Sequence, residues 1–278
     1  MVFSNRFLSI ATGLITIVAI AAAPTQVKST EQTTHWRYAG ANGPDHWGEL
    51  TQQFALCGSG KRQSPIDIRA AKPADLYPLR FDYQPIRPQI LNNGHTLQAN
   101  YNTSSIEQLK IGATTHSLPG ISVYDSRMRL GDVPYQLLQF HFHTPSEHAL
   151  NGQRYPMEVH LVHKNSDGNL AVIGIFLKKG KPNATVQTVL DNASTKLNKV
   201  NTVKNTLLNV AALLPKNRRF YHYNGSLTTP PCSENVNWFV MREPIEASSA
   251  QISRFTEIIG NNARPLQAVH WREVYISK

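Results

Sequence analysis

The amino-acid sequence predicts a mainly β protein of the α+β type, with a large, mostly antiparallel central sheet and helices at its periphery. Turn dipeptides such as Asn93-Gly94, Asn151-Gly152 and Asp167-Gly168 recur about every ten residues, which is typical of strands joined by hairpins. Short apolar or alternating runs lie between such turns, and each has the length of one strand. The clearest runs are 137–143, 157–163, 171–177 and 238–241.

Two segments have a helical pattern instead. Within residues 184–203, apolar side chains such as Val186, Val189 and Leu197 recur at roughly the period of a helix. A second helix is expected from a serine cap at 248 or 249 to about residue 259, where Gly260 ends it. From Trp36 onward the sequence contains no linker, repeat or low-complexity segment, so we expect residues 35–278 to form one domain.

The N-terminus predicts export. Residues 7–23 are apolar with few interruptions, Arg6 precedes them, and three alanines end the run, which is the pattern of a signal peptide. We therefore assign residues 1–23 to a signal peptide, with its cleavage site left open, and residues 24–34 to a flexible polar lead. The apolar run is at the short limit for a membrane span, so membrane attachment is expected only if it stays uncleaved. The predicted location is periplasmic or secreted.

Composition and cysteine content narrow the class further. Hydrophobic residues make up 41% of the chain and charged residues 17%, which is ordinary for a globular domain. The net charge of +10 comes from scattered basic residues without a long run, so we predict a solvated basic surface and no nucleic-acid partner. Because thiols pair in an exported protein, Cys57 and Cys232 are expected to form a disulfide. Two buried free thiols are the alternative.

Three histidines have the spacing of neighbouring strands. His141 and His143 are two residues apart, so in a strand they share a face with Gln139. Glu158 and His160 share a face in the next run. A hairpin signal lies between the two runs, and antiparallel pairing would bring the three imidazoles and the two polar side chains together.

Three histidines without a fourth protein ligand form the layout of a catalytic zinc site, whose open position takes water or substrate. Imidazole also binds other divalent ions. A ligating histidine needs an acceptor on its second ring nitrogen, and Gln139 and Glu158 are placed to provide one. The alternative interpretation is that these are core or surface strand histidines, with Glu158 a structural buried acid.

Further segments surround these histidines in a fixed order. They are His46-Trp47, Gln63-Ser64-Pro65-Ile66-Asp67-Ile68, Asn92-Asn93-Gly94-His95, Phe140-His141-Phe142-His143, Ser146-Glu147-His148, Glu158-Val159-His160-Leu161-Val162-His163 and Gly225-Ser226-Leu227-Thr228-Thr229-Pro230-Pro231-Cys232. In this order they resemble the α-class carbonic anhydrases, in particular exported bacterial members. The resemblance extends from about Trp36 to near the C-terminus.

The resemblance implies a zinc lyase that reversibly hydrates carbon dioxide to bicarbonate and a proton. Zinc would be held by His141, His143 and His160, and zinc-bound hydroxide would attack carbon dioxide. Thr228 would accept a hydrogen bond from that hydroxide and donate its own proton to Glu147. His95 corresponds to the proton shuttle and Tyr38 to a tyrosine that orders the cavity water. Bicarbonate and carbon dioxide would be the small-molecule partners, and a homodimer is an allowed assembly.

The resemblance also implies an apolar wall for carbon dioxide and the pairing of Cys57 with Cys232. The wall and its flanking residue would be Val162, Val172, Leu227, Thr229 and Trp238. Simpler interpretations remain: His95 as a turn residue, Glu147 as a turn cap, and Thr228 as an ordinary strand threonine. At the level of the whole protein, the alternatives are a non-catalytic binding module on the same fold and zinc esterase chemistry as a side activity.

Overall fold

The computed structural model describes residues 35–101, 126–204 and 206–278, and the structural statements below concern these residues. The predicted signal peptide and flexible lead lie outside them. No helix in the described part of the chain is both long enough and apolar enough to cross a membrane. Residues Thr34–Lys278 form one compact unit.

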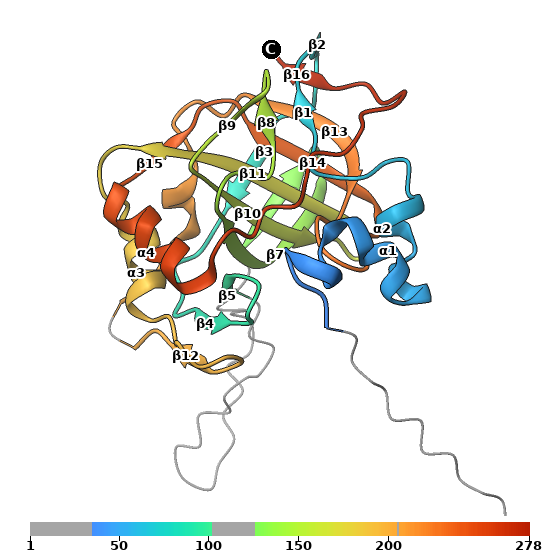
Figure 1. Cartoon of the computed structure of the whole chain (residues 1–278). Helices are drawn as coiled ribbons and strands as arrows, with labels where there is room; N and C mark the ends of the chain where they lie inside the picture. The colour runs from blue at the N-terminus through green and yellow to red at the C-terminus, as the bar shows by residue number, and fades with distance from the viewer. Residues whose placement is uncertain (1–34, 102–125, 205) are drawn as a thin grey trace, which may run out of the picture. The chain divides into compact units, whose positions relative to one another are not determined.

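A 13-stranded sheet organises the described chain (Figure 1). Its main path runs β12-β4-β5-β7-β10-β11-β14-β13-β16-β2, while β15 pairs with β11 and β6 joins β3 to β7. Most pairs are antiparallel, as predicted; β11–β14, β11–β15 and β16–β2 are parallel. The strands are β2 (Lys72–Ala74), β3 (Leu79–Asp82), β4 (Gln89–Asn92), β5 (Leu97–Asn100), β6 (Arg127–Leu130), β7 (Val133–His143), β10 (Met157–Lys164), β11 (Leu170–Lys179), β12 (Val200–Thr202), β13 (Phe220–Ser226), β14 (Glu234–Met241), β15 (Ile245–Ala247) and β16 (Tyr275–Ser277).

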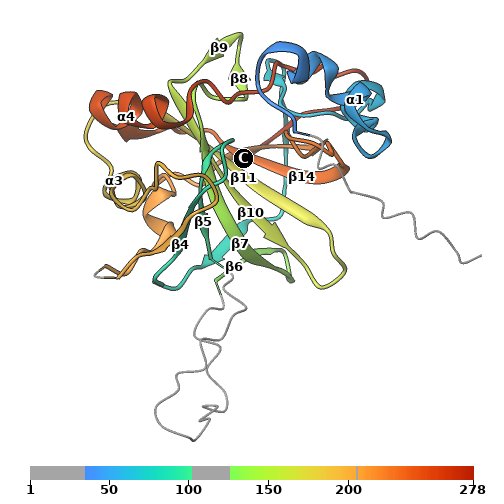
Figure 2. The same ribbon diagram turned by 60° about the horizontal axis from the view of Figure 1, so that its bottom comes forward.

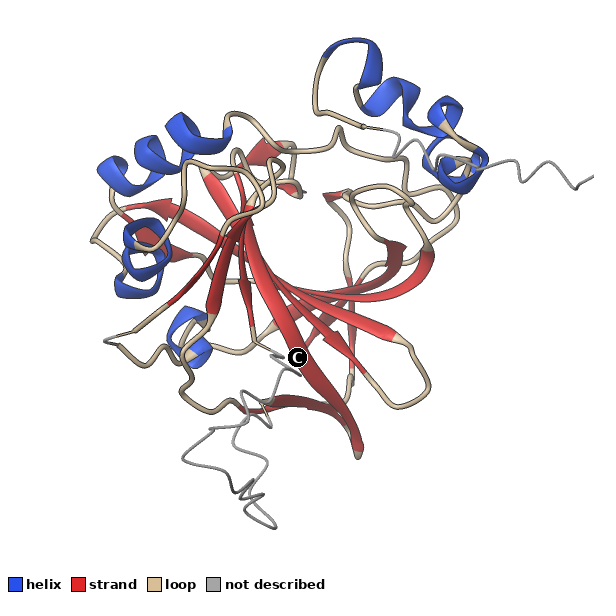
Figure 3. Cartoon of the chain, turned by 90° about the horizontal axis from the view of Figure 1, so that it is seen from below, coloured by secondary structure: helices blue, strands red, loops and turns tan. Residues whose placement is uncertain are grey.

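Helices and a small second sheet lie at the periphery (Figure 3). The α-helices are α1 (Trp47–Leu50), α2 (Leu56–Ser59), α3 (Ala184–Asp191) and α4 (Ser249–Ile259). Four 3-10 turns occur at η1 (Gly40–Asn42), η2 (Pro44–His46), η3 (Gln52–Phe54) and η4 (Val210–Leu213). The small sheet contains β1 (Asp67–Ile68), β8 (Ala149–Leu150) and β9 (Gln153–Arg154).

The long strands β7 and β10 pair antiparallel, which confirms the arrangement expected from their sequences. His160 lies directly opposite His141, and Glu158 lies opposite His143. In the sequence, the β8–β9 hairpin lies between β7 and β10. It turns at Asn151 and Gly152, whose φ angles of 51° and 82° are both left-handed. A type I′ turn requires two left-handed residues, so the asparagine–glycine pair suits this tight connection.

The central sheet separates two apolar layers. Phe142 and Leu161 belong to the larger layer, where Val186 of α3 and Phe255 of α4 pack against the sheet. The ring centroids of Phe142 and Phe255 are 6.0 Å apart, and the ring planes meet at 66°. Figure 2 shows α3 and α4 on the same side of the fanned strands. His141, His143 and His160 alternate with the residues of this layer along β7 and β10, so they face the opposite side of the sheet.

One helix agrees with the sequence prediction and one does not. Ser248 caps α4 in a capping box with Gln251, and Gly260 follows its last turn, as predicted. The predicted helix over 184–203 is wrong beyond Asp191, where α3 ends. Residues 200–202 form β12 and pair with β4, so backbone pairing at the sheet edge takes precedence over the helical pattern of the side chains. Leu197, one of the apolar residues on which the longer helix was predicted, is 63% exposed.

A buried histidine in the larger layer makes stability depend on pH. Burial lowers the pKa of His163 to about 4, and its Nε2 lies 2.8 Å from the Tyr83 hydroxyl. An unfolded histidine titrates near 6.5. Between these values the unfolded chain binds more protons than the folded chain, so the free energy of unfolding falls as pH falls. We expect the titration of His163 to lower the free energy of unfolding by about 3 kcal/mol as the pH falls from 7.5 to 4.

Urea unfolding of wild type and His163→Gln at pH 7.5 and pH 4.5 measures this effect. We expect the acid-induced loss of unfolding free energy to be smaller in His163→Gln than in wild type. Equal losses in the two proteins would show that His163 does not drive the pH dependence.

Candidate metal centre

Three imidazoles meet at the centre of the sheet. One ring nitrogen from each of His141, His143 and His160 lies within 4.8 Å of the others. The ring centroids are 5.0 Å apart for His141 and His143, 5.3 Å for His141 and His160, and 4.5 Å for His143 and His160. Strands β7 and β10 therefore bring together the residues that the sequence predicted as metal ligands.

Each of these histidines has its other ring nitrogen held by an oxygen acceptor. His141 Nδ1 donates to Gln139 Oε1 at 2.8 Å, and His160 Nε2 donates to Glu158 Oε1 at 2.9 Å. His143 Nδ1 donates to the main-chain oxygen of Asn262 at 2.8 Å. These bonds leave Nε2 of His141, Nε2 of His143 and Nδ1 of His160 with their lone pairs for a cation.

Among the three residues that accept hydrogen bonds from the histidines, Asn262 is the one that the sequence did not predict. It follows α4, is fully buried, and lies 119 residues from His143. Its amide donates to the main-chain oxygens of Phe142 and His95, and its Oδ1 accepts from the Thr144 amide. A single asparagine after a helix carries no local signal for such a role, because the contacts exist only in the folded chain.

The donor set fits a divalent metal that binds imidazole. His143 Nε2 is buried and has no hydrogen-bond partner among the described residues. Burial, together with the neighbouring histidines, lowers the pKa of His141 well below its usual value, and burial lowers that of His143 as well. Neutral imidazoles present lone pairs, and three of them without a fourth protein ligand match a catalytic zinc site.

Glu147 lies beside His143 and His160 and is fully buried. Its Oε1 accepts from the Arg264 amide at 2.9 Å, while Oε2 lies 3.4 Å from His143 Nε2 and 3.8 Å from His160 Nδ1. Oε2 has no hydrogen-bond partner in the described structure. The hydrogen bond predicted from Thr228 to Glu147 is therefore not formed, because the Arg264 amide holds one carboxylate oxygen and the other faces the histidines.

An apolar wall borders the imidazoles. Val172 and Trp238 are buried in one cluster, and Val162 and Leu227 pack against it, so the structure gathers four of the predicted wall residues. The indole of Trp238 lies edge-on to the His160 ring at 4.8 Å and donates to the Ser226 main-chain oxygen at 2.9 Å. Two further residues of the predicted site, Thr228 and Thr229, come after β13 and Leu227; Thr228 is buried and Thr229 is half-buried.

His95 occupies the turn between β4 and β5, where Asn93 Oδ1 accepts from its amide at 2.9 Å. Its ring stacks on Trp36 at 3.7 Å with an angle of 10°. Burial lowers the pKa of His95, and the nearby His35 and Arg37 lower it further. The Tyr38 ring is edge-on to His95 at 6.5 Å. Burial and the charge of Glu147 raise the pKa of Tyr38 well above its usual value, so its hydroxyl keeps its proton.

A disulfide joins Cys57 of α2 to Cys232, as predicted. Two side-chain bonds reinforce the connection: Arg264 Nη2 donates to the Cys57 main-chain oxygen at 2.9 Å, and Gln63 Nε2 donates to that of Cys232 at 3.1 Å. Both cysteines pack with Trp47. The segment that follows Thr228 is thereby fastened to the N-terminal helical turns.

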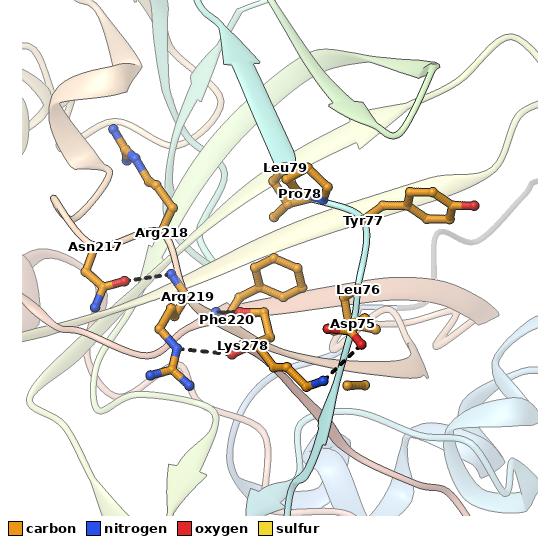
Figure 4. A pocket seen from close by; sticks show the side chains of 12 residues that line it. Asp75, Leu76, Tyr77, Pro78, Leu79, Asn217, Arg218, Arg219, Phe220 and Lys278 are labelled. Carbon is orange, nitrogen blue, oxygen red and sulfur yellow. Dashed lines mark hydrogen bonds and ion pairs between the residues drawn. The ribbon is translucent and has the colours of Figure 1, made fainter.

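A separate pocket of about 500 Å³ lies at the other end of β13, where Phe220 begins the strand (Figure 4). Its lining shares no residue with the histidine centre. Lys278 Nζ is paired with Asp75 at 2.9 Å, and Arg219 Nε donates to the Ser277 main-chain oxygen at 3.1 Å. Figure 4 shows the Arg218 and Arg219 side chains pointing in different directions, so the cations of this pocket do not converge on one point.

The sequence and the fold of this chain are similar to those of known proteins of one family. The family model for eukaryotic-type carbonic anhydrase matches residues 42–278. A carbonic anhydrase from Nostoc sp. is 42% identical over 248 residues, covering 87% of this chain and 86% of that protein. The α-carbonic anhydrase of Photobacterium profundum superimposes with a TM-score of 0.74 at 39% identity, covering 88% of this chain and all of that one. A hyperthermostable carbonic anhydrase from a hydrothermal vent chimney gives a TM-score of 0.77 at 38% identity, with 88% and 100% covered.

The fold and the histidine centre define a β-sheet protein with a candidate three-histidine metal site. The chain belongs to the eukaryotic-type, or α-class, carbonic anhydrase family.

Proposed function

We propose that the protein catalyses the reversible hydration of carbon dioxide to bicarbonate and a proton, with zinc bound by His141, His143 and His160. The main support for this proposal is that one ring nitrogen from each of the three histidines converges on one point. The second ring nitrogen of each histidine donates a hydrogen bond to an oxygen acceptor. The similarity to proteins named carbonic anhydrase supports the choice of reaction.

A bound zinc ion would lower the pKa of coordinated water toward neutrality and so supply a nucleophile at physiological pH; carbonic anhydrases are the standard example of this effect. The protein orients the three imidazoles through Gln139, Glu158 and the main-chain oxygen of Asn262. We assign Glu147, as the acceptor, and Thr228, through its hydroxyl, to orienting the reacting oxygen. In this role the Thr228 hydroxyl would donate to Glu147 Oε2, which has no hydrogen-bond partner in the described structure.

The substrate class follows from the wall beside the imidazoles. Carbon dioxide is apolar and makes few hydrogen bonds, so it is held best by packing in a dry pocket. Val162, Val172, Leu227 and Trp238 provide such a surface within one cluster. Bicarbonate is charged and gains from leaving this surface for water.

His95 is assigned to carry the spare proton to solvent. The His95 side chain is half-buried, and its lowered pKa favours the neutral form that can accept a proton. We expect His95→Ala to slow turnover in weak buffer by up to about 100-fold and imidazole buffer to restore the rate. In wild type the rate in weak buffer should rise with pH through a midpoint below 6.5.

Stopped-flow hydration measured in weak buffer from pH 5 to pH 9, with and without added imidazole, checks the shuttle. Trp36→Phe keeps an aromatic surface against His95 and serves as the control. An unchanged rate for His95→Ala in weak buffer would remove His95 from the mechanism.

The reaction itself is tested by comparing carbon dioxide hydration with ester hydrolysis on the purified mature protein, each with and without a chelator. Fast hydration that a chelator abolishes supports the proposal. Ester turnover without hydration would favour a zinc esterase, and zinc binding without either reaction would favour a non-catalytic binding module.

Export to the periplasm or beyond the cell is the location that the disulfide supports. Paired cysteines persist in oxidising compartments and are rare in reducing ones. Localisation of a tagged full-length chain by fractionation tests this assignment.

A further inference from the structure

A second group of potential metal ligands lies directly behind the first. His148, Glu158 and His160 also bring ligand atoms within 4.8 Å of one another, and all three are fully buried. His160 belongs to both groups, with one ring nitrogen on each side. The protein therefore needs a feature that keeps the His160 lone pair on the side of His141 and His143.

A chain of hydrogen bonds leads away from His160 through the second group. Glu158 Oε1 accepts from His160 Nε2 at 2.9 Å and from His148 Nδ1 at 2.7 Å, and Oε2 accepts from the His148 amide at 2.9 Å. His148 Nε2 lies 2.7 Å from the Tyr223 hydroxyl, which lies 2.8 Å from Ser64 Oγ. Ser64 Oγ also accepts from the Ser226 amide at 3.1 Å.

The direction of this chain follows from what each group can donate. A carboxylate only accepts, so the hydrogens of His160 Nε2 and His148 Nδ1 must point at Glu158. A neutral imidazole then has only a lone pair left on Nε2, and the Tyr223 hydroxyl must donate to it. Burial raises the pKa of Tyr223 well above its usual value, so that hydroxyl keeps its proton. The remaining lone pairs of Tyr223 can receive the Ser64 hydroxyl.

We propose that Tyr223 and Ser64 are positioning residues that hold the proton of His148 on Nδ1 and so fix His160 with its lone pair on Nδ1. With Nδ1 of His148 protonated and Nε2 capped by Tyr223, the second group offers a metal no imidazole lone pair on His148. The metal is thereby directed to the group of His141, His143 and His160.

Two glycines leave space for Glu158 and Ser64, which stand near the two ends of this chain of hydrogen bonds. A Cβ on Gly174 would lie 2.8 Å from Glu158 Oε1, and a Cβ on Gly225 would lie 2.2 Å from Ser64 Oγ and 2.7 Å from a ring carbon of Tyr223. Neither glycine has a positive φ among the described backbone angles, so space and not backbone conformation accounts for both. Any larger residue at either position would push a member of the chain out of hydrogen-bonding distance.

This inference rests on the proposed zinc site. The experiment below distinguishes a failure of the positioning role from a failure of the proposed function. Tyr223→Phe removes only the hydroxyl, while Tyr221→Phe, on the same strand and packed against the same cluster, is the matched control. The first readout is the zinc dissociation constant by competition with a chelator. We expect Tyr223→Phe to bind zinc about 10-fold more weakly than wild type, and Tyr221→Phe to bind as wild type does.

The second readout is the ¹⁵N chemical shift of the His148 ring nitrogens in metal-free protein. We expect the Nδ1–H form in wild type and Tyr221→Phe, and a substantial Nε2–H population in Tyr223→Phe. A wild-type His148 with its proton on Nε2, or on both nitrogens, would overturn the proposal, as would unchanged zinc affinity and shifts in Tyr223→Phe. Because this readout needs no metal, it decides the proposal even if the protein binds no zinc and the proposed function fails.

A second pair of variants applies if Tyr223→Phe does not fold. His148→Asn keeps an N–H near the place of Nδ1, and His148→Leu removes it. We expect His148→Asn to bind zinc several-fold more tightly than His148→Leu, and equal affinities would contradict the role of the Nδ1 proton.

Discussion

Replacing His160 by alanine is expected to remove zinc and carbon dioxide hydration together. The ring nitrogen lost is one of three that converge within 4.8 Å, and two remaining imidazoles hold a divalent ion poorly. Changing a residue that merely orients a ligand lowers metal affinity about 10- to 100-fold, so loss of a ligand should exceed that range. Metal content after dialysis and the hydration rate, measured on the same sample, check the prediction.

His222→Ala is the matched control for this variant. His222 is an imidazole on β13, stacked on Phe239 at 4.8 Å, and its Nδ1 donates to the Trp238 main-chain oxygen at 3.0 Å. We expect this variant to keep its zinc and its hydration rate. Full hydration by a zinc-free His160→Ala protein would refute the ligand assignment.

Loss of the disulfide is expected to lower the free energy of unfolding by about 2–5 kcal/mol. The bond joins residues 175 positions apart, so its removal frees a long loop in the unfolded chain. In the folded chain it fastens α2 to the segment that follows Thr228, so hydration should also become more sensitive to heat. Each kcal/mol corresponds to about 2–4 °C in melting temperature for a domain of this size.

Thermal and urea unfolding of the oxidised protein, the reduced protein and the Cys57→Ser/Cys232→Ser variant measure this contribution. A reductant should destabilise wild type and leave the double variant unaffected. Two titratable thiols in the native exported protein would show that the bridge is absent there.

The ligand set was predictable because its information is local. A period of two along a strand places His141 beside His143, and the Asn151-Gly152 turn returns the chain so that His160 lies opposite. The alternation of side chains along two neighbouring antiparallel strands then places the three imidazoles on one face of the sheet. The mainly antiparallel sheet and the capping box of α4 were predictable for the same reason.

Features that depend on distant parts of the chain were not predictable. Asn262 holds His143 through a main-chain oxygen, which no residue type signals. Trp36 stacks on His95 only in the folded chain, because the two residues lie far apart in the sequence. The helix predicted through residue 203 ends at Asp191, because residues 200–202 complete a sheet edge that the local pattern does not contain.

The central claim is that the three imidazoles hold one catalytic zinc. Its most direct test is the titration of zinc into metal-free protein, with bound metal and the rate of carbon dioxide hydration measured on the same samples. We predict that hydration rises in proportion to bound zinc and levels off at about one zinc per chain. Hydration by the metal-free protein, or a fully zinc-loaded protein without hydration, would contradict it.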